Sequence, residues 1–335
     1  MSPRSLAIAW CASALCVVAM SLGRLASVAA DEPPLEARLR IALASNRDHY
    51  WYPRIVLYEH DGATRGRILK TLSSPDKRLD HQPALAAQTR LGVFGWEAEG
   101  GVGRLRLWDF EKSAVIEAPE LDRVPNTLFS PSLSADAQWL AFTGWALPGG
   151  SSRWDVGLFD LKQRRMVELP SLNPAGYDQR RVAISGDGKW LAFTTNARDG
   201  RGLTDIRVYN RDTRQTDALR EANSSAGENY PTLNHDGSLV GFTSDRETGA
   251  GGQDVYVFDR ASRALVPLPG LNSPAQEQSP ALSGSGRYVV FVSERFEGEG
   301  EHDVFLFDRV AGRLVPTPDL NTARDDFDPA IIEVK

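Results

Sequence analysis

Two neighbouring side chains in the last third of the chain, His235 and Asp236, are of the types that acid–base catalysis uses. They lie in the stretch NYPTLNHDGSLVGFTSDR, residues 229–246, which also contains serine residues. A histidine beside a carboxylate could act as a general base. Whether this chemistry is available depends on the elements that position the pair, and the pattern of the whole chain indicates what these elements are.

The same pattern of residues recurs along the chain. The segment PTLNHDGSLVGF from Pro231 has four counterparts of equal length that also end in Phe: PALAAQTRLGVF from Pro83, PSLSADAQWLAF from Pro131, VAISGDGKWLAF from Val182 and PALSGSGRYVVF from Pro280. The starts are 48 to 51 residues apart. Such a period predicts stacked or radially arranged units, because one unit is too small to bury its own apolar face.

A second pattern follows in every repeat, in which apolar side chains alternate and end in an aromatic and a polar residue. It reads LRLWD from Leu105, VGLFD from Val156, IRVYN from Ile206, VYVFD from Val255 and VFLFD from Val304. Alternation with a period of two is typical of a half-buried strand. A shorter apolar patch closes each unit, so one unit is predicted to hold four antiparallel strands, as a β-propeller blade does.

The two ends of the chain together supply one more blade. RIALAS from Arg40 and RIVLYE from Arg54 look like second and third strands, and DPAIIEVK from Asp328 begins like the other first strands. We therefore predict an all-β fold, a six-bladed β-propeller of four-stranded antiparallel blades, closed by pairing the C-terminal strand with the N-terminal blade. The single domain spans 31–335, with blade 1 split between about 38–76 and 328–335 and further blades starting near 83, 131, 182, 231 and 280.

Residues 1–30 are predicted to be a secretory signal peptide. Arg4 precedes an apolar run from Leu6 to Leu22, and the small residues Val28 and Ala30 fit a signal peptidase, so cleavage is expected after Ala30. The expected location is the periplasm or the exterior, with no stable membrane span after cleavage. An uncleaved membrane anchor is the alternative, since the run approaches the length that spans a bilayer.

Charge and cysteine content exclude several classes of function. Loss of the leader removes Arg4 and Arg24 and takes the net charge from −6 to −8. No nucleic-acid partner is expected, because phosphate backbones require a basic face. Both cysteines, Cys11 and Cys16, lie in the leader, so the mature chain is expected to have no disulfide, thiolate metal site or cysteine nucleophile. The sequence contains no GxSxG or HExxH motif.

The segments SPSLSADAQWLAFTG, RVAISGDGKWLAFTT, and YPTLNHDGSLVGFTSDR followed by DVYVFDR make these units resemble the repeats of TolB-type (WD40-like) β-propellers. The resemblance covers the chain from about residue 40 to its end. It implies a rigid disc that binds a ligand, usually a protein, on the face around its central channel. TolB has an α/β domain ahead of its propeller, so the resemblance is to a stand-alone secreted propeller that lacks this domain.

Four of the six blades have a carboxylate three residues before the start of the first strand. This slot holds, in chain order, Asp80, Leu128, Gln179, Glu228, Glu277 and Asp326. First strands line the channel of a propeller, so we expect the four acids near its mouth, where like charges would attract a basic peptide or hold a cation. No other cofactor is expected. The alternative is structural, with polar residues capping the turn into each first strand.

The loops between second and third strands are expected on the same face as this slot. In three successive blades these loops carry tryptophan: Trp51, then Trp96, then Trp145 with Trp154. Such a patch could stack on a sugar or anchor a partner chain. Alternatively, each Trp packs its own loop. The other three loops are charged and Gly-rich: NARDGRGLTD, SDRETGAGGQD and SERFEGEGEHD.

Two recurring positions argue against a catalytic role for the histidine at the centre of the opening stretch. His235 lies in the turn between first and second strands, because Asp-Gly favours such turns. Other blades have other residues there: Ala87, Ala135, Gly186 and Gly284. The aspartates that open third strands recur too regularly for one active site and predict a repeated hydrogen bond or ion pair: Asp155, Asp205, Asp254 and Asp303. No histidine pair has metal-binding spacing, and His81 and His302 are expected on one face in distant blades.

The leading hypothesis is a secreted or periplasmic propeller without enzymatic activity that binds a protein or cell-envelope component through the loop face around its channel. The candidate residues for partner binding are Asp80, Glu228, Glu277, Asp326, Trp51, Trp96 and Trp145. No catalytic or metal-binding residue is proposed. The alternative is a carbohydrate-active enzyme, a hydrolase or lyase with channel-mouth carboxylates as acid and base, or a carbohydrate-binding propeller that uses the Trp patch.

Overall fold

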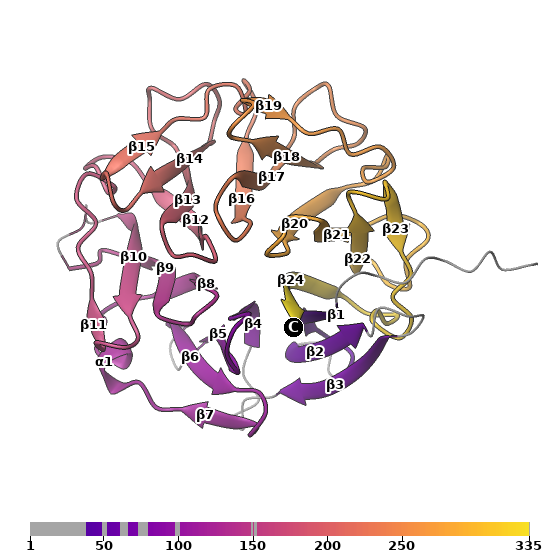
Figure 1. The fold of residues 1–335 in the computed structure, drawn as a ribbon, viewed down its shortest axis with the longest axis horizontal. Coiled ribbons are helices and arrows are strands. Elements are labelled where there is room, and N and C mark those ends of the chain that lie inside the picture. The colour runs from indigo at the N-terminus through magenta and orange to yellow at the C-terminus, as the bar shows by residue number, and fades with distance from the viewer. Residues whose placement is uncertain are drawn as a thin grey trace, which may run out of the picture. The chain divides into compact units, whose positions relative to one another are not determined.

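Six four-stranded antiparallel sheets, formed by the residues that the structure describes, surround a central channel in a computed structural model (Figure 1). The described residues are 38–48, 52–60, 66–72, 80–97, 101–148, 150 and 153–334. The predicted signal peptide and Trp51 lie outside them. Within these ranges, the structure contains no helix with the length and apolarity needed to cross a membrane.

Each sheet is one blade whose strands follow one another outward from the channel. Blade 1 consists of β24 (Asp326–Val334), β1 (Arg38–Ser45), β2 (Arg54–His60) and β3 (Gly66–Leu72). Blade 2 consists of β4 (Asp80–Leu85), β5 (Leu91–Glu97), β6 (Gly103–Asp109) and β7 (Ala114–Ile116). Blade 3 follows the short helix α1 (Pro119–Asp122) and consists of β8 (Leu128–Leu133), β9 (Trp139–Trp145), β10 (Trp154–Asp160) and β11 (Arg165–Met166).

The remaining three blades keep the same order. Blade 4 consists of β12 (Gln179–Ile184), β13 (Trp190–Thr195), β14 (Asp205–Asn210) and β15 (Gln215–Asp217). Blade 5 consists of β16 (Glu228–Leu233), β17 (Leu239–Ser244), β18 (Asp254–Asp259) and β19 (Ala264–Leu265). Blade 6 consists of β20 (Glu277–Leu282), β21 (Tyr288–Ser293), β22 (Asp303–Asp308) and β23 (Arg313–Val315).

The ring closes in blade 1, where strands from the two ends of the chain pair. In Figure 1 the yellow β24 lies beside the indigo β1. The two strands are antiparallel, with Arg38 opposite Val334 and Ile41 opposite Ile331. The predicted six blades and their closure are therefore confirmed. Closure matters because it leaves β1 with a partner on each side instead of an exposed sheet edge.

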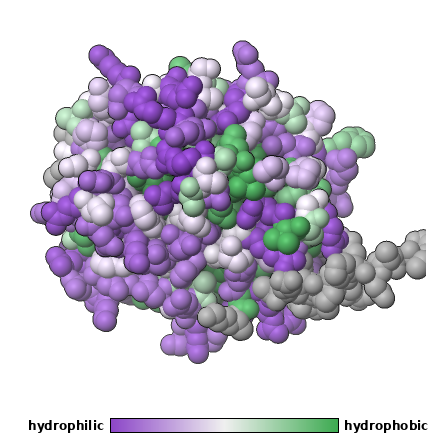
Figure 2. Space-filling model, turned by 45° about the horizontal axis from the view of Figure 1, so that its top comes forward, coloured by the Kyte–Doolittle hydropathy of each residue, from purple (hydrophilic) through white to green (hydrophobic). Residues whose placement is uncertain are grey.

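The recurring apolar residues pack between neighbouring blades. The five Phe residues that mark the repeat are at most 2% exposed: Phe94, Phe142, Phe193, Phe242 and Phe291. One cluster joins Val156 and Leu158 of blade 3 to Ile184 and Phe193 of blade 4. Burial of such a side chain contributes about 1.5–3 kcal/mol, so each blade depends on its neighbours for stability. On the face in Figure 2, hydrophobic residues gather near the middle of a mainly hydrophilic surface.

Every first strand has an irregularity at the same place, two residues after the slot. The residue there has a left-handed backbone, with φ between 49° and 55°: Gln82, Ser130, Arg181, Tyr230, Ser279 and Asp328. The pairing with the second strand shifts at this point, for example between His81 and Ala84. Such a bulge bends a strand and re-aims its side chains. The six bulge residues consequently line one cavity at the mouth of the channel.

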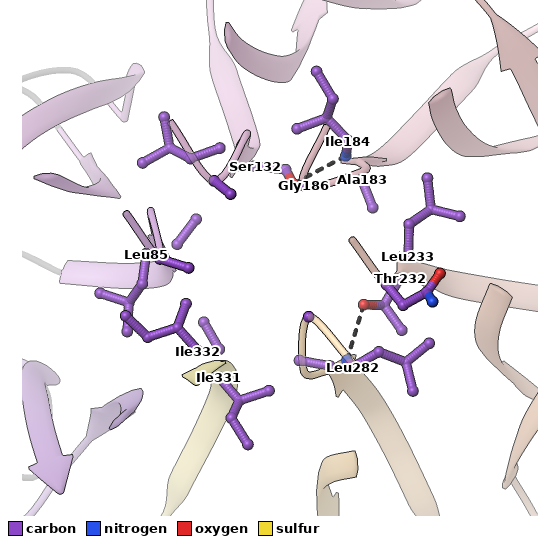
Figure 3. Close-up of a pocket in the computed structure, with 18 of the residues that line it drawn as sticks. Leu85, Ser132, Ala183, Ile184, Gly186, Thr232, Leu233, Leu282, Ile331 and Ile332 are labelled. Carbon is purple, nitrogen blue, oxygen red and sulfur yellow. Dashed lines mark hydrogen bonds between the residues drawn. The ribbon is translucent and has the colours of Figure 1, made fainter. Parts of the chain in front are cut away.

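The turns between first and second strands surround the opposite end of the channel. They are joined across blades by backbone hydrogen bonds, including those from Ala135 N to Gly186 O (2.8 Å) and from His235 N to Gly284 O (2.9 Å). The channel between the two ends has a volume of about 210 Å³ and is lined mostly by Pro, Ala, Leu and Ile residues (Figure 3). The predicted turn at His235 is confirmed, because β16 ends at Leu233 and β17 begins at Leu239.

Candidate functional site at the channel mouth

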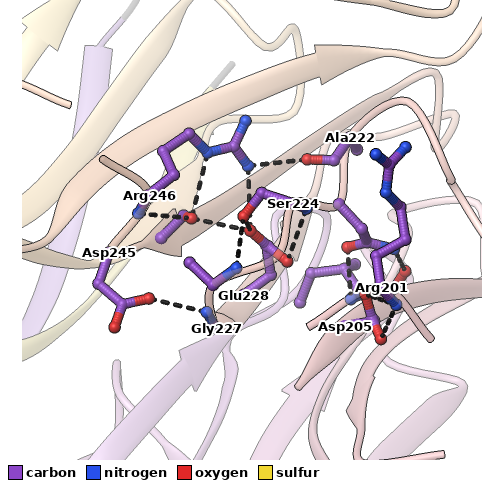
Figure 4. Close-up of polar contacts among 12 residues, drawn as sticks. Arg201, Asp205, Ala222, Ser224, Gly227, Glu228, Asp245 and Arg246 are labelled. Atoms are coloured by element: carbon purple, nitrogen blue, oxygen red, sulfur yellow. Dashed lines mark hydrogen bonds and ion pairs between the residues drawn. The ribbon is translucent and has the colours of Figure 1, made fainter. Parts of the chain in front are cut away.

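The carboxylates of the slot are buried inside the blades. Glu228 is 0% exposed, and its carboxylate accepts hydrogen bonds from the Ser224 hydroxyl (2.5 Å) and the Ser244 hydroxyl (2.8 Å). Arg246 supplies the counter-charge, with Nη2 3.2 Å from Glu228 Oε1 (Figure 4). The same guanidinium donates to the Ala222 carbonyl and lies 4.2 Å from the ring centroid of Tyr256.

Two of the other three acidic blades, blade 6 and blade 1, repeat this arrangement. Glu277 is held by the Ser273 hydroxyl (2.5 Å), the Ser293 hydroxyl (2.9 Å) and Arg295 Nη2 (3.1 Å). Asp326 accepts from the Thr322 backbone N (2.8 Å) and pairs with Arg47 (3.4 Å). Asp80 is likewise 0% exposed.

The expectation that these four acids gather their charge at the channel mouth is therefore wrong in its geometry. The bulge re-aims the strand after the slot, so the slot side chain points into the blade and the residue two positions later reaches the mouth. A buried Glu277 or Glu228 lies beneath its Arg and Ser partners and cannot meet a glycosidic bond in this conformation. The arrangement supports a capping role for Glu228, Glu277 and Asp326, whose carboxylates accept from the backbone N–H four residues earlier.

The aspartates that open third strands have the repeated structural role predicted from their recurrence. Asp205 accepts from the backbone N of Arg201 (3.0 Å), and Asp303 accepts from that of Gly300 (2.9 Å). A glycine stands five residues before each aspartate, where a Cβ would collide with the carboxylate: Gly150, Gly200, Gly249 and Gly298. These hydrogen bonds fix the loop between the second and third strands of the blade.

Burial raises the pKa of Asp303 above its ordinary value, and the nearby charge of Asp326 raises it further. The folded protein therefore binds a proton more readily than the unfolded chain, so this carboxyl makes stability fall as pH rises through the window between the two pKa values. We expect Asp303→Asn to be better tolerated at pH 7 than at pH 4, measured as the free energy of unfolding in urea.

Asp236 provides the control of opposite sign. The Ser238 hydroxyl, 2.6 Å from Asp236 Oδ1, is the main reason that the pKa of this carboxyl is lowered. Its contribution is present above the unfolded pKa and is lost as pH falls through the lower folded value. Asp236→Asn should therefore destabilise less at acid pH than at pH 7, and an equal pH trend in both variants would contradict the assignment.

A cavity of about 510 Å³ opens beside the channel mouth, within the range of small-molecule sites. Residues of blades 1 to 4 line it: Pro53, His81, Gln82, Phe129, Ser130, Thr143, Trp154, Arg180, Arg181, Phe327 and Asp328. A chain of ring contacts forms one wall, with centroids 5.9 Å apart for His81 and Phe129 and 5.7 Å for Phe129 and Trp154. This cavity, called the mouth pocket below, combines an aromatic wall with two arginines.

Two glycines of blade 2 make room for this wall. A Cβ at Gly95 in β5 would lie 2.7 Å from His81 Cε1, and one at Gly103 in β6 would lie 2.7 Å from Phe129 Cε1. Both rings therefore lie against bare backbone. Burial is the main reason that the pKa of His81 is lowered, although the nearby Asp328 opposes the shift. Burial also raises the pKa of Asp328, although His81 and Arg181 oppose it.

Comparison with known proteins identifies the fold. No family model matches the sequence, and no curated protein sequence matches it. The solved structure of TolB from Acinetobacter baumannii matches with a TM-score of 0.60 at 16% identity, over 89% of this chain and 67% of that one. A TolB-type protein from Agrobacterium tumefaciens matches with a TM-score of 0.57 at 15% identity, over 89% and 99%. This chain has a TolB-like propeller fold.

A chain from a nidogen/laminin complex also matches the TolB-like propeller, with a TM-score of 0.58 at 11% identity, over 88% of this chain and 98% of that one. Identities this low establish a shared fold and leave function to be argued from the site.

The predicted tryptophans do not form one patch in the described part of this TolB-like propeller. Trp145 is 43% exposed and meets Trp154 edge to face, with ring centroids 5.5 Å apart. Trp96 lines a separate cavity in blade 2 and lies 4.2 Å from the guanidinium carbon of Arg106. Trp145 thus extends the aromatic wall of the mouth pocket, whereas Trp96 packs elsewhere.

One group of potential metal ligands occurs among the described residues, formed by Glu301, His302 and Asp325. His302 already has carboxylate neighbours on both ring nitrogens, with Nδ1 3.1 Å from Asp325 and Nε2 3.3 Å from Glu294. These polar contacts account for the geometry of the cluster without an ion. As predicted, His302 in blade 6 and His81 in blade 2 belong to different blades.

Sequence reasoning missed the residues that do reach the mouth. The bulge residue stands directly before a proline in five of the six blades, as Tyr230 does before Pro231. Proline has no backbone N–H to donate to a sheet and is confined to edges, strand starts and bulges, so a recurring X-Pro at the start of a first strand was a usable signal of irregular pairing. It would have pointed to Arg181 and Asp328 by alignment of the repeats.

Proposed function

We propose that this TolB-like propeller is a secreted or periplasmic protein without enzymatic activity that binds a protein or envelope partner through the loop face around its channel. The observation that supports this most is the mouth pocket, which opens on that face and carries an aromatic wall beside Arg180 and Arg181. Aromatic and Arg side chains dominate the energetics of protein interfaces. The signal peptide and the location remain part of the proposal.

Exposed apolar side chains on the same face add support. Phe296 is 101% exposed and Leu203 is 82% exposed, and both lie in loops between second and third strands. Trp145, at the end of β9, is 43% exposed. Covering large apolar side chains with a partner lowers the free energy, because it removes apolar surface from water. Association through this face is therefore more favourable than through a uniformly polar face.

Affinity capture from the envelope of the source organism tests the proposal. The tagged chain should enrich a partner identified by mass spectrometry, and the triple variant Trp145→Arg, Leu203→Arg, Phe296→Arg should lose it. His235→Ala is the matched control, since His235 is exposed at the other end of the channel and two blades already have Ala there. Equal enrichment by all three proteins, or none by the wild type, would overturn the proposal.

A further inference from the structure

The mouth pocket contains an arginine, Arg181, that forms no close ion pair among the described residues, although the charge of the nearby Asp328 acts on it. Within the described residues, the Arg181 guanidinium has no carboxylate oxygen at ion-pair distance, and its contact is the ring of Tyr230, with Cζ 4.2 Å from the centroid. The bulge, with φ of 55° at Arg181, places this residue at the mouth. Stacking on Tyr230 holds the guanidinium while leaving its N–H groups available to an acceptor.

A second arginine stands beside it, on the aromatic wall. Arg180 lies 5.2 Å over the Trp154 ring and pairs with Asp178 at 2.8 Å. Its side chain is 51% exposed, so the guanidinium can also reach a ligand. Arginine forks bind carboxylates with two parallel hydrogen bonds, which makes an anionic group the best match for this side of the pocket.

The aromatic wall determines which uncharged part of the ligand fits beside the anionic group. Phe129, Trp154 and Phe327 present ring surface, which favours an apolar or aromatic body next to the anion. Thr143 is 3% exposed, and its hydroxyl has no hydrogen-bond partner in the described part of the chain. The equivalent Thr194 and Thr243 share this property but do not line the mouth pocket. Thr143 can therefore donate to a carbonyl placed in the pocket.

The pocket also continues into the channel mouth. Four residues line both cavities: Gln82, Ser130, Arg181 and Asp328. A small acid would fill the pocket alone, whereas a chain could place its last residue in the pocket and run its preceding residues over the mouth. The continuity of the two cavities favours a chain.

We propose that the mouth pocket binds the C-terminal residue of a partner protein, with its carboxylate on Arg181 and Arg180 and an aromatic side chain against Phe129 and Trp154. This inference rests on the proposed function, because it assumes a protein partner on the loop face and specifies which segment of that partner binds.

The test compares an N-terminally labelled hexapeptide, Gly-Ser-Gly-Ser-Leu-Phe, as free acid and as C-terminal amide, by fluorescence anisotropy with the full chain. A charge-assisted hydrogen bond contributes about 1.5–3 kcal/mol, which corresponds to about tenfold or more in affinity. The free acid should bind about tenfold tighter or more. Arg181→Ala should bring the ratio of the two affinities close to one, Arg181→Lys should retain part of it, and His235→Ala should leave it unchanged.

Three outcomes would overturn the inference: equal binding of acid and amide, no binding of either, or binding of 3-phenylpropionate as tight as that of the peptide. The last would indicate a site for small aromatic acids. Failure here is distinguishable from failure of the proposed function, because capture by the wild-type chain is measured without the peptides, and Leu203 and Phe296 of its triple variant do not line the mouth pocket. If capture succeeds and the peptides do not bind, the loop face binds its partner by another part of the partner.

Discussion

Replacing Arg295 by alanine is expected to destabilise the propeller by about 3–5 kcal/mol, the range for a buried ion pair that loses one partner. The Arg295 side chain is 6% exposed and that of Glu277 is 0% exposed. Arg295 also donates to the Leu271 carbonyl at 2.6 Å and lies 4.7 Å from the ring centroid of Phe305. Its removal leaves the Glu277 charge in the blade with hydroxyl and backbone donors alone. Urea unfolding followed by tryptophan fluorescence measures the loss.

Blade 4 supplies the matched control for this substitution. Its slot residue is Gln179, 1% exposed, and the position equivalent to Arg295 is occupied by Ala197. The double variant Glu277→Gln, Arg295→Ala copies this pair, removes the buried charge and should recover most of the lost stability. If the double variant were as unstable as Arg295→Ala alone, lost packing of the guanidinium would be the cause. A loss below about 1 kcal/mol in the single variant, as for an exposed pair, would contradict the buried-pair interpretation.

The blade architecture could be predicted because the same physical requirement recurs in each repeat. A residue such as Phe242 must be apolar in every blade, since it fills the space between two sheets, and its regular spacing reveals the repeat directly. The closing strand was predictable for the same reason. DPAIIEVK has the residues of a first strand, which the N-terminal blade otherwise lacks, and in the structure Ile331 pairs with Ile41 of that blade.

The slot was misplaced because alternation alone assigns a side chain to one side of a strand and cannot show a bulge. A single bulge reverses which residues face the channel, so Glu228 is buried and Tyr230 reaches the mouth. The sequence did contain a clue to the ion pair. An arginine follows the slot by 18 residues in two acidic blades, at Arg246 and Arg295, whereas the blades with Gln179 and Asp80 have Ala197 and Ala98 there.

The mouth pocket could not be predicted from the repeat, because its residues are those that the repeat does not specify. Trp154 and Arg181 occupy positions at which other blades have different residues, and Phe129 depends on the space that Gly103 leaves in the neighbouring blade. A site built from such exceptions becomes visible only when the blades are placed side by side. The residues that differ between blades therefore indicate function, whereas the residues that recur in every blade determine the fold.

Ending the chain at Asp325 is expected to prevent the propeller from folding as a soluble monomer. This truncation removes β24, so β1 loses its antiparallel partner along Arg38–Ser45 and becomes an exposed sheet edge. The apolar side chains of β1 that pack at 0% exposure, Leu39, Ile41 and Leu43, would then lose their cover on the channel side. Size-exclusion chromatography and the thermal unfolding midpoint should show aggregation or a large loss of stability.

A peptide of residues 326–335 added to the truncated chain separates strand pairing from other effects of shortening. If closure is the cause, the peptide should restore the monomer and raise the unfolding midpoint in a concentration-dependent way, because binding to the folded state alone stabilises it by mass action. The same peptide with Ile331→Asp and Ile332→Asp should fail, since both side chains are 6% exposed in the closed ring. A truncated chain that stayed monomeric with an unchanged midpoint would mean that five complete blades and three strands suffice, and that the covered edge of β1 contributes little to stability.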